Sequence, residues 1–271
     1  MCVCFYNDPT PSPPPSSQSQ LLYKASKKRF DADPDFKARA REAVTRLQGG
    51  EPAVVAAWER ICAASRAEFE QIYDRLGVAI TERGESFYNP ALPGVVEDLK
   101  AAGVAVESDG ATVVWTEGLT APLIVQKSDG GFGYATTDLA ALRQRVSDEG
   151  ADWVIYVTDA GQATHFRQVF DAARRAAIIP ADPAATPLPR IDHVGFGLVL
   201  GADGKRIRTR DEGAAVRLVE LLDEAVSRCA ASLREREPDA DPAFIDAAAK
   251  AMGYGAVKYA DLKNNRTTNY K

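Results

Sequence analysis

The stretch ADWVIYVTDAGQATHFRQVF, residues 151–170, constrains the fold most, because a short apolar run passes directly into a helical pattern. The apolar run predicts a buried strand. Residues 158–161 end that strand, and the first turn of the following helix carries the polar residues Gln162 and His165. Ligands of open parallel sheets lie beyond the carboxyl ends of the strands, where the next helix begins. The junction is therefore a candidate ligand site.

The middle of the chain alternates between strand and helix patterns. The predicted elements, in order, are a helix at 95–102, β-like runs at 111–118 and 121–128, a helix at 137–146, a strand at 152–157 and a helix at 162–177. This order, with mostly apolar strands, predicts an α/β fold whose parallel sheet is covered by helices on both faces. A further stretch, 193–209, alternates like a β-hairpin around Gly201 to Gly204.

Helical patterns dominate the two ends of the chain. Apolar residues recur near helical spacing over 35–76, and the sequence QGGEP interrupts them, which predicts a pair of helices. Two long helices are predicted at 214–236 and 242–262. The start of the chain is rich in proline and serine and has no periodic apolar face, so residues 1–20 are predicted to be disordered.

Composition excludes several classes of protein. A net charge of −5 and a pI of about 5.3 give no general basic field for nucleic acid, so any RNA contact must use local basic clusters. No apolar run approaches the roughly 18–20 residues that a membrane span needs, so we expect no membrane partner. The four cysteines show no metal-ligand spacing beyond one C-x-C, so we expect reduced intracellular thiols and no protein-bound metal.

Four side chains near the strand–helix junction are candidates for a binding pocket. Tyr134 and Asp138 are four residues apart, one helical turn, so a hydroxyl and a carboxylate could face one pocket. An ordinary structural explanation is also open: Asp138 favours the dipole of a helix N-terminus, and Tyr134 belongs to the core. Gln162 and His165 are likewise compatible with first-turn residues that have structural partners. Spacing alone does not decide between these explanations.

Five separated blocks carry a resemblance to a known family. They are FYNPALPGVVEDL, YATTDLAAL, YVTDAGQATHF, HVGFGLVLGADGKRIRTR and GYGAVKYADLKNNRTTNYK. In this order and at this approximate spacing, from about residue 21 to 271, the chain resembles the catalytic domain of arginyl-tRNA synthetase. The resemblance implies a Rossmann-like class I synthetase nucleotide-binding fold, a parallel sheet with flanking helices and a helical insertion, followed by long helices.

The activity implied by the resemblance is the ATP-dependent attachment of L-arginine to tRNA(Arg) through arginyl-adenylate, in translation. The implied partners are L-arginine, tRNA(Arg) and ATP, with Mg²⁺ accompanying the ATP. We expect a monomer in the cytoplasm, with the chloroplast or mitochondrion as the alternative location.

The resemblance also assigns roles in the arginine pocket. Arginine is a planar, always charged fork of donors, so a pocket that selects it over lysine needs a carboxylate and fixed neutral acceptors. By resemblance, Asp138 and the Tyr134 hydroxyl face the guanidinium and Gln162 faces the α-amino end. The polar first turn of the helix is then a wall of the pocket. His165 is expected to support that wall and not to act as a general base.

Two further blocks are assigned to ATP by resemblance. The adenine-binding segment comprises His193, Val194, Gly195 and Gly197, whose alternative explanation is a glycine-rich strand edge. The place of the class I KMSKS loop is taken by a segment whose expected catalytic residues are Arg206, Arg208, Thr209 and Arg210. Cations in that loop neutralise charge that develops on the ATP phosphates. A basic cluster alone is more often a solvated turn.

The sequence departs from the family pattern at both ends. No HIGH signature is present, since the only histidines are His165 and His193. We therefore expect an internal fragment: a disordered N-terminus at 1–20, a partial catalytic domain at 21–235, and a helical region at 236–271 that leads to a missing anticodon-binding domain. Such a chain is expected to be inactive alone and poorly soluble, because a missing first strand leaves an open sheet edge and an apolar face.

Two other functions stay open or are disfavoured. A non-catalytic fragment that binds arginine or tRNA is the alternative, and arginine binding without pyrophosphate exchange would identify it. A generic Rossmann oxidoreductase is disfavoured, because no G-x-G-x-x-G opens a helix after a strand.

Overall fold

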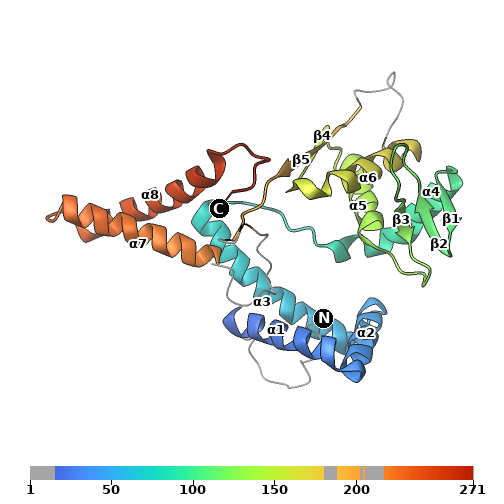
Figure 1. The fold of residues 1–271 in the computed structure, drawn as a ribbon, viewed down its shortest axis with the longest axis horizontal. Helices are drawn as coiled ribbons and strands as arrows, with labels where there is room; N and C mark the ends of the chain where they lie inside the picture. Colours follow the sequence, from blue (N-terminus) through green and yellow to red (C-terminus); the bar gives the residue numbers. More distant parts are fainter. Residues whose placement is uncertain (1–15, 180–187, 202–203, 205–216, 271) are drawn as a thin grey trace. The chain divides into compact units, whose positions relative to one another are not determined.

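The computed structural model describes residues 16–179, 188–201, 204 and 217–270. The chain divides into two compact units, and each is described by itself (Figure 1). The first unit comprises Met1–Ile80 and Arg208–Tyr259, and the second comprises Thr81–Ile207 and Ala260–Lys271. The division that the sequence predicts after residue 235 stays a prediction, although the two long helices on either side of it lie largely in one unit.

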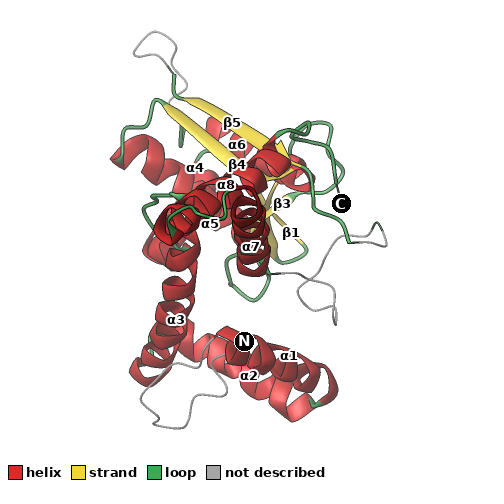
Figure 2. Ribbon diagram, turned by 90° about the vertical axis from the view of Figure 1, so that its left-hand side faces the viewer, coloured by secondary structure: helices red, strands yellow, loops and turns green. Residues whose placement is uncertain are grey.

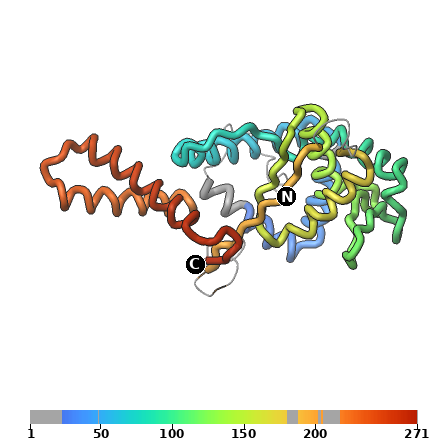
Figure 3. Tube along the Cα trace, turned by 90° about the horizontal axis from the view of Figure 1, so that it is seen from above, coloured from blue at the N-terminus to red at the C-terminus, as the bar shows by residue number. Residues whose placement is uncertain are grey.

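The described part of the first unit is helical. Its helices are α1 (Ser16–Ala32), α2 (Pro34–Gln48), α3 (Pro52–Leu76), α7 (Leu218–Arg236) and α8 (Pro242–Leu262). The first three contact one another, and α7 and α8 run side by side as an antiparallel hairpin (Figures 1 and 3). The predicted long helices are confirmed for the described residues. The predicted disorder of residues 1–20 stays a prediction; residues 1–15 lie outside the described residues, and α1 begins at Ser16.

Local signals explain where α2 and α3 begin and end. Both have a proline in their first turn, where a missing N–H costs nothing. The Asp33 side chain caps α2 by accepting a hydrogen bond from the backbone N–H of Phe36 at 3.0 Å. That bond and the neighbouring Arg29 lower the pKa of Asp33. Gly77 ends α3 in the left-handed conformation, with φ at 64°. The predicted break between two helices is confirmed.

Small residues let α7 and α8 pack closely. Ala230 and Leu233 of α7 form a buried apolar cluster with Ile245 and Ala249 of α8. Farther along α8, a Cβ added to Gly253 would lie 2.8 Å from the backbone nitrogen of Val226. The two backbones therefore approach one another at a position that accepts only glycine.

The second unit contains two sheets and the helices that cover them. Its helical elements are η2 (Glu85–Ala91), α4 (Leu92–Ala101), α5 (Tyr134–Arg143), η3 (Gln144–Asp148), η4 (Ala160–Gln162) and α6 (Ala163–Arg175). Its strands are β1 (Ala105–Ser108), β2 (Ala111–Val114), β3 (Leu123–Gln126), β4 (Trp153–Asp159) and β5 (Arg190–Phe196). A continuous core of buried residues, including Leu99, Val125, Leu139, Leu142 and Val169, joins these elements.

Only part of the predicted parallel sheet is present among the described residues. β4 and β5 are parallel, in register from Trp153 beside Arg190 to Asp159 beside Phe196 (Figure 2). β1, β2 and β3 instead form a separate antiparallel sheet. The reason is that the connections are short: Asp109 and Gly110, both with positive φ, join β1 to β2, whereas a parallel crossover needs a dozen or more residues.

The predicted α/β class is confirmed, with helices packed against the sheets, but among the described residues only one face of β4 is covered. On one face of β4, Val154 and Tyr156 are buried in the core. On the other, Trp153, Ile155 and Val157 are 51%, 45% and 64% exposed. The strand therefore has the alternating burial of a sheet with one covered face.

The first arm of the predicted hairpin at 193–209 pairs with other parts of the chain. Residues 190–196 pair in parallel with β4, and Val199 forms a parallel bridge with Tyr270. Most of the other arm lies outside the described residues. The alternating pattern correctly indicated extended chain, but the partners of that chain are distant in sequence.

Candidate functional site

The carboxyl end of β4 passes into α6 through a capped turn. The Asp159 side chain accepts a hydrogen bond from the Gly161 N–H at 3.1 Å and one from Gln162 Nε2 at 2.8 Å. Gln162 itself is the N-cap of α6. Asp159 thus accepts hydrogen bonds from a side chain of the same turn and from a backbone N–H at the start of a helix, where N–H groups have no partner within the helix. Asp159, which sequence reasoning did not single out, is the centre of the turn.

Asp138 and His165 meet between α5 and α6. His165 Nε2 lies 2.6 Å from Asp138 Oδ2, and their side chains are 28% and 29% exposed. An ionised carboxylate only accepts hydrogen bonds, so this contact needs a proton on Nε2. The His165 ring also meets the Phe166 ring edge-on, with centroids 5.3 Å apart. The structure therefore places His165 as a support of Asp138.

Tyr134 is not a core residue. It is the first residue of α5, and it is 75% exposed. Its hydroxyl has no hydrogen-bond partner in the part of the chain that the structure describes. The structural explanation that placed Tyr134 in the core is therefore wrong, and the hydroxyl is available to a ligand.

A tyrosine lies buried behind the Asp138 region. The Tyr156 ring packs against Phe166 and Phe170, with centroids 4.7 and 5.5 Å away, and the Arg145 guanidinium lies 5.0 Å from its centroid. Its hydroxyl is buried without a hydrogen-bond partner among the described residues. Burial raises the pKa of Tyr156 to about 12, the Asp138 charge adds to the rise, and Arg145 opposes it. Tyr156 is therefore neutral at pH 7.

β5 places His193 beside α6. The His193 ring stacks on Phe166, and its Nε2 lies 2.8 Å from the Thr158 hydroxyl oxygen of β4. Val194 pairs with Val157 in the sheet register and is partly buried. His193 and Val194, two of the four residues of the predicted adenine segment, thus have structural partners in the sheet and in α6.

The two glycines of that segment touch other parts of the chain. A Cβ on Gly195 would lie 2.9 Å from Ala160 Cα, and one on Gly197 would lie 2.3 Å from the Thr268 carbonyl oxygen. Close packing therefore explains both glycines without a ligand. Whether they also admit a nucleotide base stays a prediction.

Residues 265–270, here called the C-terminal strap, lie along the end of β5 and the chain beyond it. Gly197 N donates to the Arg266 carbonyl oxygen at 2.8 Å, Leu198 N donates to Asn269 Oδ1 at 2.7 Å, and Leu200 N donates to the Tyr270 carbonyl oxygen at 2.8 Å. The Arg266 guanidinium donates to the Gly195 carbonyl oxygen. Sequence reasoning missed Arg266, because no local pattern indicates a contact between positions 71 residues apart.

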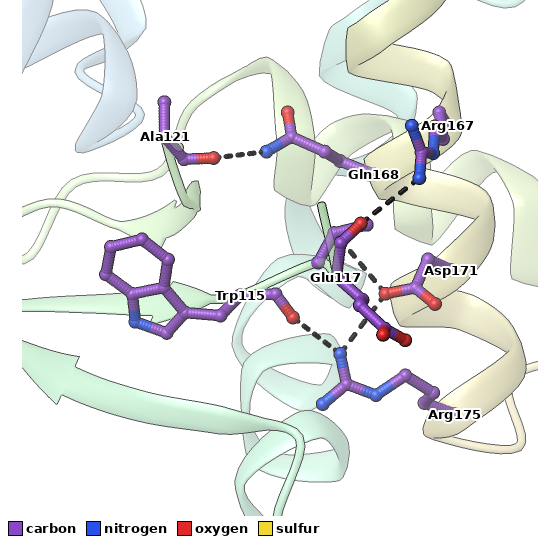
Figure 4. Close-up of polar contacts among 8 residues, drawn as sticks. Trp115, Glu117, Ala121, Arg167, Gln168, Asp171 and Arg175 are labelled. Atoms are coloured by element: carbon purple, nitrogen blue, oxygen red, sulfur yellow. Dashed lines mark hydrogen bonds and ion pairs between the residues drawn. The ribbon is translucent and has the colours of Figure 1, made fainter. Parts of the chain in front are cut away.

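The other side of α6 holds the connection between β2 and β3, as Figure 4 shows. Arg167 donates to the Glu117 carbonyl oxygen at 3.1 Å, Gln168 donates to that of Ala121 at 2.7 Å, and Arg175 donates to that of Trp115 at 2.6 Å (Figure 4). These contacts fix α6 in rotation about its axis. His165, near the start of the helix, is therefore held at a defined position beside α5.

The remaining predicted residues receive no structural account. Arg206, Arg208, Thr209 and Arg210 lie outside the described residues. Within the ranges that are described, no group of three or more His, Cys, Asp or Glu side chains could hold a metal ion. No helix in those same ranges is long and apolar enough to cross a membrane.

Comparison with known proteins points to one family. The family model of the tRNA synthetases class I (R), catalytic domain, matches residues 6–271, farther towards the N-terminus than the resemblance predicted. The chloroplastic/mitochondrial arginine–tRNA ligase of Arabidopsis thaliana is 55% identical over 253 residues, 93% of this chain and 39% of that protein. The arginine–tRNA ligase of Thermosynechococcus vestitus is 54% identical over 259 residues, 92% of this chain and 43% of that protein.

Solved structures agree with the sequence relatives. The crystal structure of arginyl-tRNA synthetase from Plasmodium falciparum superposes with a TM-score of 0.75 at 30% identity, over 96% of this chain and 41% of that one. The Thermus thermophilus arginyl-tRNA synthetase has a TM-score of 0.68 at 18% identity, which shows the shared fold alone. The chain thus spans about two fifths of the length of the proteins it matches.

Proposed function

Because this chain belongs to the family of class I tRNA synthetases (R), of which it carries catalytic-domain sequence, we propose that the surface between α5 and α6 binds L-arginine for an arginine–tRNA ligase. The reaction is the formation of arginyl-adenylate from arginine and ATP, followed by transfer of arginine to tRNA(Arg). The observation that carries the proposal is the Asp138 carboxylate, which is partly exposed and held by His165 of α6, the helix that follows β4.

Asp138 supplies the charge that an arginine side chain requires. A carboxylate and a guanidinium form parallel, charge-assisted hydrogen bonds, which the compact ammonium of lysine does not match. The Tyr134 hydroxyl, exposed and without a partner among the described residues, is the proposed second acceptor. In the described structure Gln162 binds Asp159, so its proposed contact with the α-amino end requires a rotation of its amide away from that partner.

The ATP end of the site is proposed at β5 and beyond. Residues 193–197 are the proposed adenine segment, and the basic residues Arg206, Arg208 and Arg210, with Thr209, are proposed to act on the phosphates. Mg²⁺ accompanies ATP as part of the substrate. The C-terminal strap supports the proposal, because its hydrogen bonds to 195–200 hold this segment in extended form.

Three further assignments stay predictions. Relatives with chloroplastic/mitochondrial and with cytoplasmic names match at 55% and 53% identity, so the cytoplasm remains a prediction with the organelles as the alternative. The monomeric state and the tRNA partner are proposed on the same basis as the activity.

Isothermal titration calorimetry of the purified chain with L-arginine tests the pocket, with L-lysine as the ligand control. Asp138→Asn keeps the shape and removes the charge, so we expect it to abolish arginine binding while the circular dichroism spectrum is unchanged. Asp98→Asn is the matched control. Asp98 of α4 pairs with Arg143 of α5, the helix that also carries Asp138, and this variant should not alter arginine binding. Unchanged arginine affinity in a folded Asp138→Asn variant would show that the pocket is elsewhere.

A pyrophosphate-exchange assay distinguishes the proposed ligase from the alternative function. The second candidate is a non-catalytic fragment that binds arginine or tRNA. Arginine-dependent exchange of pyrophosphate into ATP would identify a ligase, and arginine binding without exchange would identify the binding fragment.

A further inference from the structure

Asp138 has a single polar partner in the described structure. His165 Nε2 bonds to its Oδ2 atom at 2.6 Å, and the other oxygen, Oδ1, has no hydrogen-bond partner in the ranges that are described. A carboxylate has about four lone-pair positions, and His165 takes one of them. Both oxygens can therefore still accept hydrogen bonds from a ligand while the carboxylate is held in one orientation.

His165 is itself firmly placed. The buried side of α6 includes Phe166, Val169 and Ala172, and the contacts in Figure 4 hold the helix to the 115–121 connection. The His165 ring adds an edge-on contact with Phe166. The orientation of Asp138 is thus set by a residue on a rigid element, 27 positions farther along the chain.

Orientation matters differently to the two basic amino acids. A guanidinium binds a carboxylate through two coplanar donors, so its affinity depends on the plane of the carboxylate. An ammonium is a compact point charge with three rotatable donors, and it follows a carboxylate that turns. Fixing Asp138 therefore strengthens arginine binding more than lysine binding.

Resting on the function proposed above, we propose that His165 is a specificity-determining positioning residue, whose Nε2–H orients Asp138 so that the site discriminates a guanidinium from an ammonium. His165 touches neither ligand in this role. It acts through the orientation of the Asp138 carboxylate.

Two amide variants of His165, which differ in length by one methylene group, separate this role from a structural one. In His165→Gln the side-chain amide nitrogen reaches about as far as Nε2 and can still donate to Asp138. In His165→Asn the amide is also polar but ends about one bond short of it. Gln has a higher helix propensity than Asn, whereas Asn and His are in the same range, so His165→Asn itself costs little helix stability, and circular dichroism and urea denaturation check that both variants are folded before their affinities are compared.

The experiment is calorimetry with L-arginine, and competition by L-lysine against bound L-arginine. The loss of one charge-assisted hydrogen bond predicts that His165→Asn raises the Kd for arginine about tenfold or more, and that the Kd for lysine changes less than about twofold. His165→Gln should keep the arginine Kd within about threefold of the unsubstituted chain.

Each other result overturns a defined claim. Equal weakening of arginine and lysine, no weakening in His165→Asn, or equal losses in the Gln and Asn variants would show that His165 does not set the specificity. If the folded, unsubstituted chain binds no arginine, the proposed function fails and this inference fails with it. Arginine binding that is lost in Asp138→Asn but indifferent to His165 refutes the inference and leaves the proposed function intact.

Discussion

The ring of Phe166 stacks on the ring of His193, with centroids 4.9 Å apart and the planes 19° from parallel. Phe166 belongs to the first turns of α6, and His193 belongs to β5, where its Nε2 is 2.8 Å from the Thr158 hydroxyl of β4. One aromatic contact thus joins the helix that carries the candidate pocket to both parallel strands.

Replacing Phe166 by leucine should weaken this junction. Phe166 is 3% exposed, and leucine leaves a small void and removes the stack, so we expect a loss of about 1–3 kcal/mol in the free energy of unfolding. Urea denaturation measures it. Phe244→Leu on α8 is the control, because Phe244 is 54% exposed and should change stability by less than about 0.5 kcal/mol. Equal losses of stability in the two variants would contradict the stabilising role of Phe166 at this junction.

Tyr156 should make the protein sensitive to alkali. Burial raises the pKa of its hydroxyl to about 12, above the ordinary value of about 10 for a tyrosine. The folded state therefore retains a proton that the unfolded state loses. This contribution is complete below pH 10 and is lost as the pH rises from about 10 to 12.

Tyr156→Phe should remove that sensitivity. It also removes a buried hydroxyl without a partner among the described residues, so stability at pH 7 should be unchanged or slightly higher. Thermal unfolding between pH 8 and 11 measures both effects. Tyr270→Phe is a second test of the same linkage, since the pKa of Tyr270 is also raised to about 12, there first by its hydrogen bond to Asp261, so this variant should also be less alkali-sensitive. A Tyr156→Phe variant that is as alkali-sensitive as the unsubstituted chain would refute the explanation.

Two glycines of α8 should respond oppositely to alanine. At Gly253 a new Cβ would lie 2.8 Å from the Val226 nitrogen and 2.9 Å from its Cα, so Gly253→Ala must separate the two helices and cost about 1–3 kcal/mol. At Gly255 a Cβ meets nothing within 4 Å, and Gly255→Ala should stabilise the helix by about 0.5–1 kcal/mol. Chemical denaturation of both variants is the measurement, and a shared sign would mean that α7 and α8 are not packed in this way.

The exposed face of β4 should cause weak association at high protein concentration, although the chain is proposed to be a monomer when dilute. Trp153, Ile155 and Val157 form an apolar row on one strand, and such rows bind other apolar surfaces. The double change Ile155→Thr and Val157→Thr keeps β-branched side chains, so folding should persist while association falls. Sedimentation velocity over a range of concentrations tests this. Val106→Thr, a change at another exposed strand residue, should leave association unaltered, and a double variant that still associates equally would refute the prediction.

Most helices were predictable from sequence because their signals are local. The two glycines and Pro52 gave the break before α3, and the apolar periodicity gave α7 and α8. β1 was missed, although the Asp109–Gly110 pair that follows it is a strong hairpin signal. The parallel sheet was predicted too large, because an apolar run specifies a strand but not the strand with which it pairs.

The site shows the same division between local and distant information. The positions of Gln162 at the start of α6 and of Asp138 one turn into α5 follow from the local pattern, and their proposed roles follow from the family resemblance. The bond from Asp138 to His165 spans 27 residues, and the bond from Arg266 to the Gly195 backbone spans 71. Neither spacing is a helical or strand period, so only the folded structure reveals these partners.

The contacts between α6 and the 115–121 connection have a consequence for how this protein can change over evolutionary time. Arg167, Gln168 and Arg175 all bind backbone carbonyl oxygens, which every amino acid carries. Side chains at 115, 117 and 121 can therefore drift without loosening the helix, whereas Thr116, whose hydroxyl donates to Asp171, is tied to its chemistry. The connection thus tolerates substitution at these positions because side chains of α6 bind its backbone.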